Sequence, residues 1–245
     1  MAPRFAAILP EGAASFTPPI IASTLPPLPK RGALPDWSLS GWLYLRGGRD
    51  AAPEGIAAAG QIGGSQAGVR LAHRLDAAGR SRAYGRATVA VQRVRQRELA
   101  LGVAHAPVAG LPVDLAVERR VAIGREGRGA FAAIVAGGVG ASRLPAGFRL
   151  DTYAQAGVVG ARRRDGFADG AVVIDRRLGV GSLRFGALAA GAVQPGAARV
   201  DVGPRLTLGL PQVGRGARLA LDWRQRIAGE ARPESGLALT LAADF

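Results

Sequence analysis

The sequence predicts an all-β protein, a closed antiparallel up-and-down β-barrel of the transmembrane type with about twelve strands. Three observations lead to this class. From Trp37 to Phe245, successive segments alternate apolar and polar side chains, which is the period of a strand with two unlike faces. The segments are about ten residues long, as a tilted membrane-spanning strand requires, whereas strands of soluble domains average about five or six. The chain has 36 glycines and few aromatic residues, so it would fill a two-sheet core poorly.

The last segment, Gly236–Phe245, illustrates the pattern. Leu237 and Leu241 share one register with Phe245, while small or polar residues occupy the other. A final strand that stops on an aromatic residue resembles the closing strand of bacterial outer-membrane barrels. That resemblance implies that the barrel-assembly machinery is a partner and recognises Phe245. We also expect this strand to pair antiparallel with Trp37–Arg46, because closure abolishes both sheet edges.

The first five predicted strands follow the alternation in order. In Trp37–Arg46 the leucines occupy one register, and Ser38, Ser40, Trp42, Tyr44 and Arg46 occupy the other. The next four place apolar residues opposite polar ones as follows: Val69 and Leu71 opposite Arg70 and Arg74 in Gln66–Leu75; Val89 and Val91 opposite Arg82 and Arg86 in Arg82–Gln92; Leu99, Leu101 and Val103 outward in Glu98–Val108; Val117 and Val121 opposite Asp114, Glu118 and Arg120 in Val113–Gly124.

The other predicted strands before the last continue the series. Ala130–Arg143 is too rich in Ala, Val and Gly for its faces to be assigned. The remaining five are these: Phe148–Ala161, with Leu150 and Val158 opposite Arg149, Asp151, Tyr153 and Gln155; Ala168–Leu178, with Val172 and Ile174 opposite Asp169, Asp175 and Arg177; Leu183–Gln194, with Phe185 opposite Arg184; Val200–Leu210, with Leu206 and Leu208 opposite Asp201, Arg205 and Thr207; Ala217–Ile227, with Leu221 and Trp223 opposite Arg218, Asp222, Arg224 and Arg226.

The segments outside the strands predict the topology. Residues 1–35 hold half of the prolines, and we interpret them as an extended segment before the barrel domain, residues 36–245. Their start is a poor secretory signal, so we expect a signal peptide upstream. With both termini periplasmic, Gly47–Gly64 becomes the longest extracellular loop. The periplasmic turns are then Gly110–Pro112, Pro145–Gly147 and Gly179–Gly181.

Composition excludes several chemistries. The chain has no Cys, which rules out disulfides, Cys-ligated zinc and a Cys nucleophile. Its formal charge of +14 comes almost wholly from Arg, because Lys30 is the only lysine. Two interpretations stay open: a codon bias toward Arg, or a need for planar bidentate donors toward carboxylates and phosphates. The arginines of the outward loops either pair with lipopolysaccharide phosphates or are simply solvated: Arg93, Arg95, Arg97, Arg125, Arg128, Arg162, Arg163 and Arg164.

If the polar register faces the lumen, arginines outnumber carboxylates there. One interpretation is a set of cross-strand ion pairs that fill and close a narrow barrel. The other is an electropositive path for an anionic saccharide or polysaccharide. The arginines predicted to line that path are Arg70, Arg74, Arg82, Arg86, Arg120, Arg149, Arg184, Arg205, Arg218, Arg224 and Arg226.

Enzymatic and nucleic-acid functions find little support. Only His73 and His105 could serve a Ser–His site with Ser65, Ser81 or Ser142, and a His at a strand end is more often an interfacial polar residue. Ligands for a metal are too few, and no phosphate-binding loop precedes a helix, so no cofactor is expected. The arginines are interspersed with acids, which argues against nucleic acid as a partner.

Two stretches resemble a known family. Ala100–Gly124 and Ala217–Phe245, together with Ala83–Gln92, are similar to the C-terminal barrel region of NfrA-type outer-membrane proteins. The resemblance implies a barrel associated with phage adsorption and exopolysaccharide export. The long helical repeats of that family do not occur in this sequence. The leading hypothesis is therefore an outer-membrane barrel that acts as a passive pore or export conduit for an anionic saccharide; the alternative is a non-conducting receptor or structural anchor.

Overall fold

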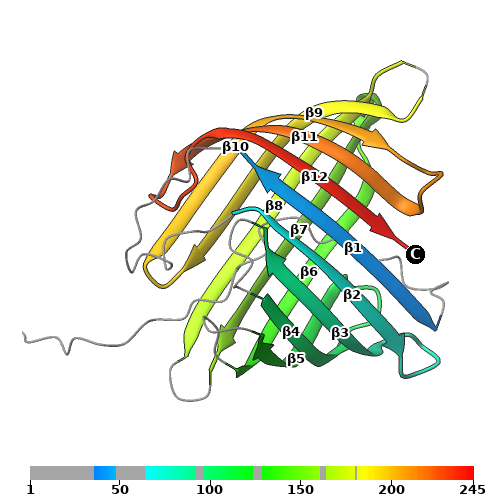
Figure 1. Ribbon diagram of the computed structural model, residues 1–245. Coiled ribbons are helices and arrows are strands. Elements are labelled where there is room, and N and C mark those ends of the chain that lie inside the picture. Colours follow the sequence, from blue (N-terminus) through cyan, green and yellow to red (C-terminus); the bar gives the residue numbers. More distant parts are fainter. Residues whose placement is uncertain (1–35, 48–63, 92–96, 124–128, 161–163, 180) are drawn as a thin grey trace, which may run out of the picture.

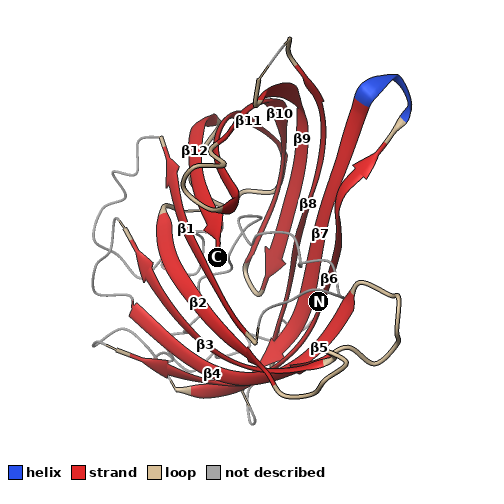
Figure 2. Cartoon of the chain, turned by 90° about the vertical axis from the view of Figure 1, so that its right-hand side faces the viewer, coloured by secondary structure: helices blue, strands red, loops and turns tan. Residues whose placement is uncertain are grey.

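The computed structural model describes residues 36–47, 64–91, 97–123, 129–160, 164–179 and 181–245, and these form a closed barrel (Figures 1 and 2). A short 3-10 turn, η2 (Pro145–Gly147), is part of one connection. No helix among the described residues is long and apolar enough to cross a membrane. The strands of the described part are β1 (Trp37–Arg46), β2 (Gln66–Arg74), β3 (Ser81–Ala90), β4 (Arg97–His105), β5 (Val113–Ala122), β6 (Ala130–Arg143), β7 (Phe148–Val159), β8 (Asp165–Arg177), β9 (Leu183–Gln194), β10 (Ala197–Gly209), β11 (Arg215–Ala228) and β12 (Gly236–Asp244).

Each strand pairs antiparallel with its neighbours in the sequence, and β1 pairs with β12 to complete the ring. At this seam Leu43 lies opposite Leu241. Leu39 and Phe245 exchange both backbone hydrogen bonds, at 3.1 and 2.8 Å, so the last residue is held at the seam. The predicted fold class and the predicted contact between first and last strands are both confirmed.

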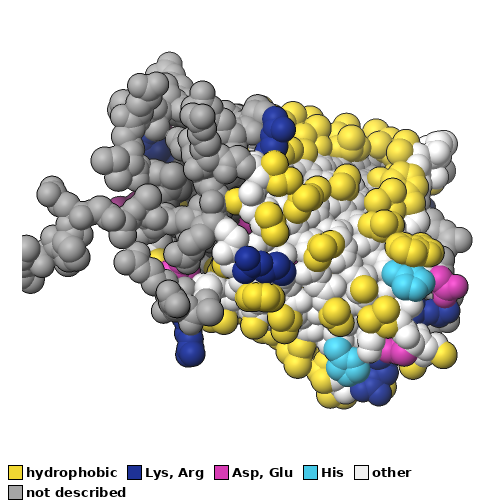
Figure 3. Space-filling view, turned by 60° about the horizontal axis from the view of Figure 1, so that its bottom comes forward, with side chains coloured by type: hydrophobic (Ala, Val, Ile, Leu, Met, Phe, Trp, Pro, Cys, Tyr) yellow, Lys and Arg dark blue, Asp and Glu magenta, His cyan; other side chains and the backbone are white. Residues whose placement is uncertain are grey.

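The wall is apolar outside and polar inside. Leu101, Val117 and Ile227 are 71%, 59% and 60% exposed, and hydrophobic side chains cover the outer wall in Figure 3. The inward register holds the buried charged residues. In β6, whose faces the sequence left open, Ala130 and Ala132 face inward and Phe131 faces outward. A soluble protein does not expose so many large apolar side chains, whereas a wall surrounded by hydrocarbon does.

Two ends of the barrel must be distinguished. We call the end at which β1 begins and β12 stops the terminal end, and the opposite one the loop end. The predicted turns at Gly110–Pro112 and Pro145–Gly147 lie at the terminal end, and so do Gly179 and Gly181, on either side of a residue outside the described ranges.

The predicted strand boundaries are shifted by up to three residues. β4 stops at His105 rather than Val108, while β8 and β10 start three residues before the predicted Ala168 and Val200. Some predictions lie outside the described residues: the N-terminal segment 1–35, the loop between Gly47 and Gly64, and the loop arginines Arg93, Arg95, Arg125, Arg128, Arg162 and Arg163.

Candidate functional site: the charged lumen

The arginines that the sequence placed in the lumen all lie on the inward register. Arg74 is at the terminal rim, where its Nη2 pairs with Asp36 at 2.6 Å. Seven others lie deeper on the inner wall and form three groups with buried carboxylates, and a fourth group involves arginines that the sequence did not select. For Arg70, Arg218 and Arg226 the described residues show no carboxylate ion pair.

The first group surrounds Glu118 of β5, which is 2% exposed. Its carboxylate accepts hydrogen bonds from Tyr84 Oη at 2.7 Å, Arg86 Nη2 at 2.9 Å and Arg120 Nε at 2.6 Å. Tyr84 and Arg86 belong to β3, so these bonds pass over β4. Gly102 of β4 makes this possible, because a Cβ there would lie 2.7 Å from Tyr84 Cζ and 2.8 Å from Glu118 Cβ.

Two further pairs extend this first group along β3. Arg82 Nη2 lies 2.5 Å from Asp114, and Arg86 Nη2 also donates to Glu98 at 3.0 Å. Arg70 of β2 lies next to it, with its guanidinium 4.1 Å from the centre of the Tyr84 ring. Arg70 therefore adds a positive charge that an aromatic face, rather than a carboxylate, accommodates.

Two more carboxylates each take two arginines. Asp175 of β8 pairs with Arg149 Nη2 at 3.0 Å and with Arg184 Nε at 2.5 Å. Asp222 of β11, which is fully buried, pairs with Arg205 Nε at 3.0 Å and with Arg224 Nη2 at 3.3 Å. Arg149 also pairs with Asp151 at 3.0 Å, which balances the charges around Asp175. The Asp222 group keeps one uncompensated positive charge.

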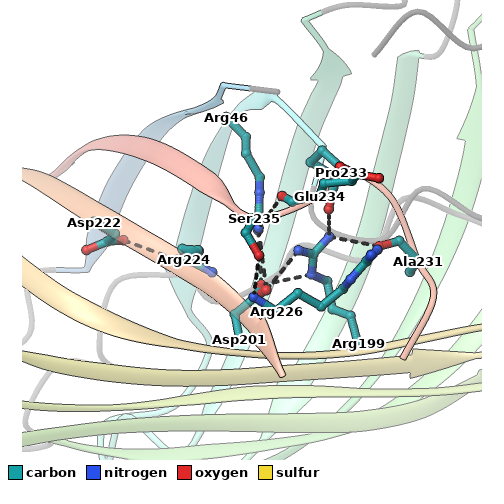
Figure 4. A network of polar contacts seen from close by, with 10 residues as sticks. All are labelled: Arg46, Arg199, Asp201, Asp222, Arg224, Arg226, Ala231, Pro233, Glu234 and Ser235. Carbon is teal, nitrogen blue, oxygen red and sulfur yellow. Dashed lines mark hydrogen bonds and ion pairs between the residues drawn. The ribbon is translucent and has the colours of Figure 1, made fainter. Parts of the chain in front are cut away.

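The fourth carboxylate, Asp201, lies near the loop end (Figure 4). It pairs with Arg46 Nη1 of β1 at 3.0 Å and with Arg199 Nη2 of its own strand at 2.8 Å. The side chains of all three are almost completely buried. Since β11 and β12 lie between β10 and β1, the Arg46–Asp201 pair spans this part of the lumen rather than following the wall.

The same arginines hold the β11–β12 connection, residues 229–235, which we call the mouth latch. Arg199 Nη1 donates to the carbonyls of Ala231 at 3.1 Å and Pro233 at 2.6 Å. Arg46 Nη2 donates to the Glu234 carbonyl, and Arg226 Nη1 donates to the Ala231 carbonyl, both at 3.1 Å. Figure 4 shows these donors converging on the latch.

The latch reaches other strands of the inner wall. Ala231, 3% exposed, belongs to a buried apolar cluster with residues of β6, β7, β8 and β9. Those residues are Ala130, Ala132, Val159, Phe167 and Ala192. A connection that starts at β11 and returns to β12 therefore packs inside the barrel instead of extending into solvent.

Sequence reasoning missed Arg46 and Arg199 as lumen residues of interest. Arg46 stood in the polar register of the first strand, beside Tyr44, and could have been grouped with the others. Arg199 fell into the turn before the predicted start at Val200. Extending the alternation backward from Asp201 would have placed it on the inner face.

The candidate Ser–His residues lie elsewhere. Ser81 Oγ is 3.0 Å from His105 Nδ1, at the terminal end and on the outward register. His73 stacks on Trp37, with ring centres 4.4 Å apart. Within the described ranges, no three His, Asp or Glu side chains gather as a metal site.

Fold and site together define a transmembrane β-barrel with a cation-rich lumen. No family model and no curated protein matches the chain. Among solved structures it is similar in fold to LpxR from Salmonella typhimurium, at 12% identity and a TM-score of 0.41, covering 85% of this chain and 99% of that one. It is also similar to the NanC porin, at 8% identity and a TM-score of 0.40, covering 83% and 97%. The resemblance to NfrA-type proteins stays a prediction.

Proposed function

We propose that this protein is a Gram-negative outer-membrane β-barrel whose lumen conducts anionic saccharides or polysaccharides. The observation that carries the proposal is a surplus of arginine over carboxylate on the inner wall: two arginines pair with one carboxylate at Asp201 and again at Asp222, and the described residues show no carboxylate ion pair for Arg70, Arg218 and Arg226. Simple cross-strand closure needs only one cation for each anion. The surplus of arginines leaves positive charge along the inner wall. The low dielectric there strengthens the attraction between this charge and an anion in the lumen.

Arginine suits this role for a geometric reason. Its planar guanidinium presents paired N–H donors that match the two oxygens of a carboxylate, such as that of a uronic acid. In each group the carboxylate fixes the guanidiniums in place, so their orientation is set before a permeant arrives. Arg70, which lies on Tyr84 without an ion-paired carboxylate in the described residues, is a cation available to an anion.

A non-conducting receptor or structural anchor is the second candidate. The observation in its favour is that Arg46–Asp201 and Arg86–Glu118 join strands that are not neighbours, and that the mouth latch packs inside the loop end. Such contacts brace a barrel and narrow it. A closed barrel would still offer its outer loops as a receptor surface.

The proposal extends to the membrane around the barrel. Both termini are periplasmic, with the loop end outside, because this orientation places the latch toward the source or destination of an extracellular saccharide. Arg97 and Arg164 at the loop end pair with lipopolysaccharide phosphates. The outward, 56% exposed ring of Phe245 at the closing seam serves recognition by the barrel-assembly machinery.

Reconstitution in planar bilayers tests conduction. We expect a conductance that prefers anions, measured from the reversal potential in a salt gradient. Arg70→Gln should lower this preference, because it removes a cation without orphaning a carboxylate. Arg119→Gln is the matched control, since Arg119 lies outward against Phe131 and should leave selectivity unchanged. Absence of any conductance would favour the receptor or anchor.

A further inference from the structure

We propose that the Asp201 group is a carboxylate-binding site for the incoming saccharide, and that binding there releases the mouth latch. The choice of ligand rests on the proposed conduction of anionic saccharides. The site itself rests on Arg46 and Arg199, which both pair with Asp201 at the loop end, and on Arg226, which lies opposite Asp201 on β11 and donates to the latch.

The charge balance favours an added anion. Asp201 neutralises one of the three guanidiniums, and one nitrogen of each, Arg46 Nη2, Arg199 Nη1 and Arg226 Nη1, donates to neutral backbone carbonyls of the latch. Hydrogen bonds from a guanidinium to a carboxylate are shorter and about twice as strong as bonds between neutral groups. A ligand carboxylate therefore competes well for the donors that now hold residues 229–235.

The geometry couples this exchange to the latch. A single nitrogen, Arg199 Nη1, holds both the Ala231 and the Pro233 carbonyls, so one change of partner weakens the hold on both. Arg226 Nη1 is the second donor to Ala231. Once the guanidiniums leave, the latch keeps two backbone donors, from Ala231 N–H to the Ala198 carbonyl at 3.1 Å and from Arg226 N–H to Ser235 Oγ at 3.0 Å. Packing adds little to these, because only the small side chains of Ala231 and Pro233 are buried apolar groups in the latch.

Thiol labelling measures this release directly, because the chain contains no Cys. Ala231→Cys places one thiol at the buried point of the latch. We expect a membrane-impermeant fluorescein maleimide to label it slowly in lipid vesicles, and about tenfold faster with saturating trigalacturonic acid. Maltotriose, the neutral counterpart, and sulfate should not accelerate labelling. Equal rates with and without trigalacturonic acid would overturn the proposal, and so would equal acceleration by maltotriose or sulfate.

Three further variants complete the test. Glu230→Cys, at an exposed latch position, should label fast under every condition and shows that the reagent reaches the mouth. In the Ala231→Cys protein, Arg199→Gln should label fast without ligand, because the two carbonyls lose their main donor; should that variant fail to assemble, Arg226→Gln gives a smaller change of the same sign. Slow labelling of both arginine variants without ligand would contradict the proposal that these arginines hold the latch. Since the readout is latch exposure and not current, a barrel that never conducts still answers the question.

Discussion

The indole ring of Trp42 lies directly over Gly68, its partner residue on β2. A Cβ on Gly68 would overlap the indole at Cζ2, lie 2.7 Å from Cη2, and approach the Ala87 carbonyl at 2.8 Å. Trp42 is the one tryptophan of the chain on the inward register, since Trp37 and Trp223 are outward and exposed. Gly68 therefore provides the space that lets a large aromatic ring lie against the inner wall.

Gly68→Ala should destabilise the barrel by about 1–3 kcal/mol, as an added methyl in a filled site does. Urea unfolding in lipid vesicles, followed by heat-modifiable gel mobility, measures the change. Gly191→Ala is the control, because a Cβ there would meet its nearest atoms at 3.6 and 3.8 Å. The double variant Gly68→Ala/Trp42→Leu should recover stability relative to Gly68→Ala, and a merely additive result would contradict the contact.

The twelve strands were predictable because each presents one face to hydrocarbon and one to a polar lumen, and that contrast appears in the sequence with period two. The inward and outward faces of β6 were not predictable, since Ala and Gly occur on both sides of that strand. Closure followed from the same pattern, because an unpaired edge is costly in a membrane.

The candidate site was only partly predictable. Which arginines face inward follows from alternation, but which carboxylate each one meets depends on small residues such as Gly102 that open a path over a neighbouring strand. The latch was not foreseen at all. Residues 229–235 resemble an ordinary polar turn, and they fold inward because Arg46 and Arg199, distant in sequence, supply donors there.

The closing seam predicts a cross-link. Leu39 and Phe245 form a hydrogen-bonded pair, so Ser40 and Asp244 form the adjacent non-hydrogen-bonded pair, whose Cα atoms are closer, at about 4.5 Å. Ser40→Cys/Asp244→Cys should therefore form a disulfide under mild oxidation, seen as a mobility change in a denaturing gel that a reductant reverses. Ser38→Cys/Asp244→Cys, displaced by two residues, should not. Equal cross-linking of both pairs would mean that the seam slips.

Replacing the buried Glu118 should lower the stability of the barrel and raise its selectivity for anions. Glu118→Gln keeps the shape but removes the nearer of the two carboxylates that Arg86 and Arg120 share, which leaves them Glu98. Breaking a buried pair in this way costs about 3–5 kcal/mol. Asp151→Asn, at a quarter-exposed pair with Arg149, should cost about 0–1 kcal/mol. Urea unfolding compares them. In bilayers, Glu118→Gln should raise anion preference, and a fall would contradict a cationic lumen.

Asp76, in the β2–β3 turn outside the strands, predicts a defined pH dependence. A hydrogen bond from the Ser81 side chain, followed by the Arg80 backbone N–H, lowers the pKa of the Asp76 carboxyl from 3.8 to about 2. Its oxygens also accept the backbone N–H groups of Arg80 at 2.9 Å and Ser81 at 2.6 Å. Because the folded pKa lies below the unfolded one, the turn gains stability that is complete above about pH 4 and is lost as the pH falls through about 2. Carboxyl NMR should show a midpoint near 2, and the Ser81 amide should stay protected from exchange down to about pH 4 and lose protection below it. In the control variant Asp76→Asn, protection of the Ser81 amide should not change as the pH falls below about 4. A wild-type Asp76 titration midpoint near the ordinary 3.8 would mean that the turn does not hold the carboxylate.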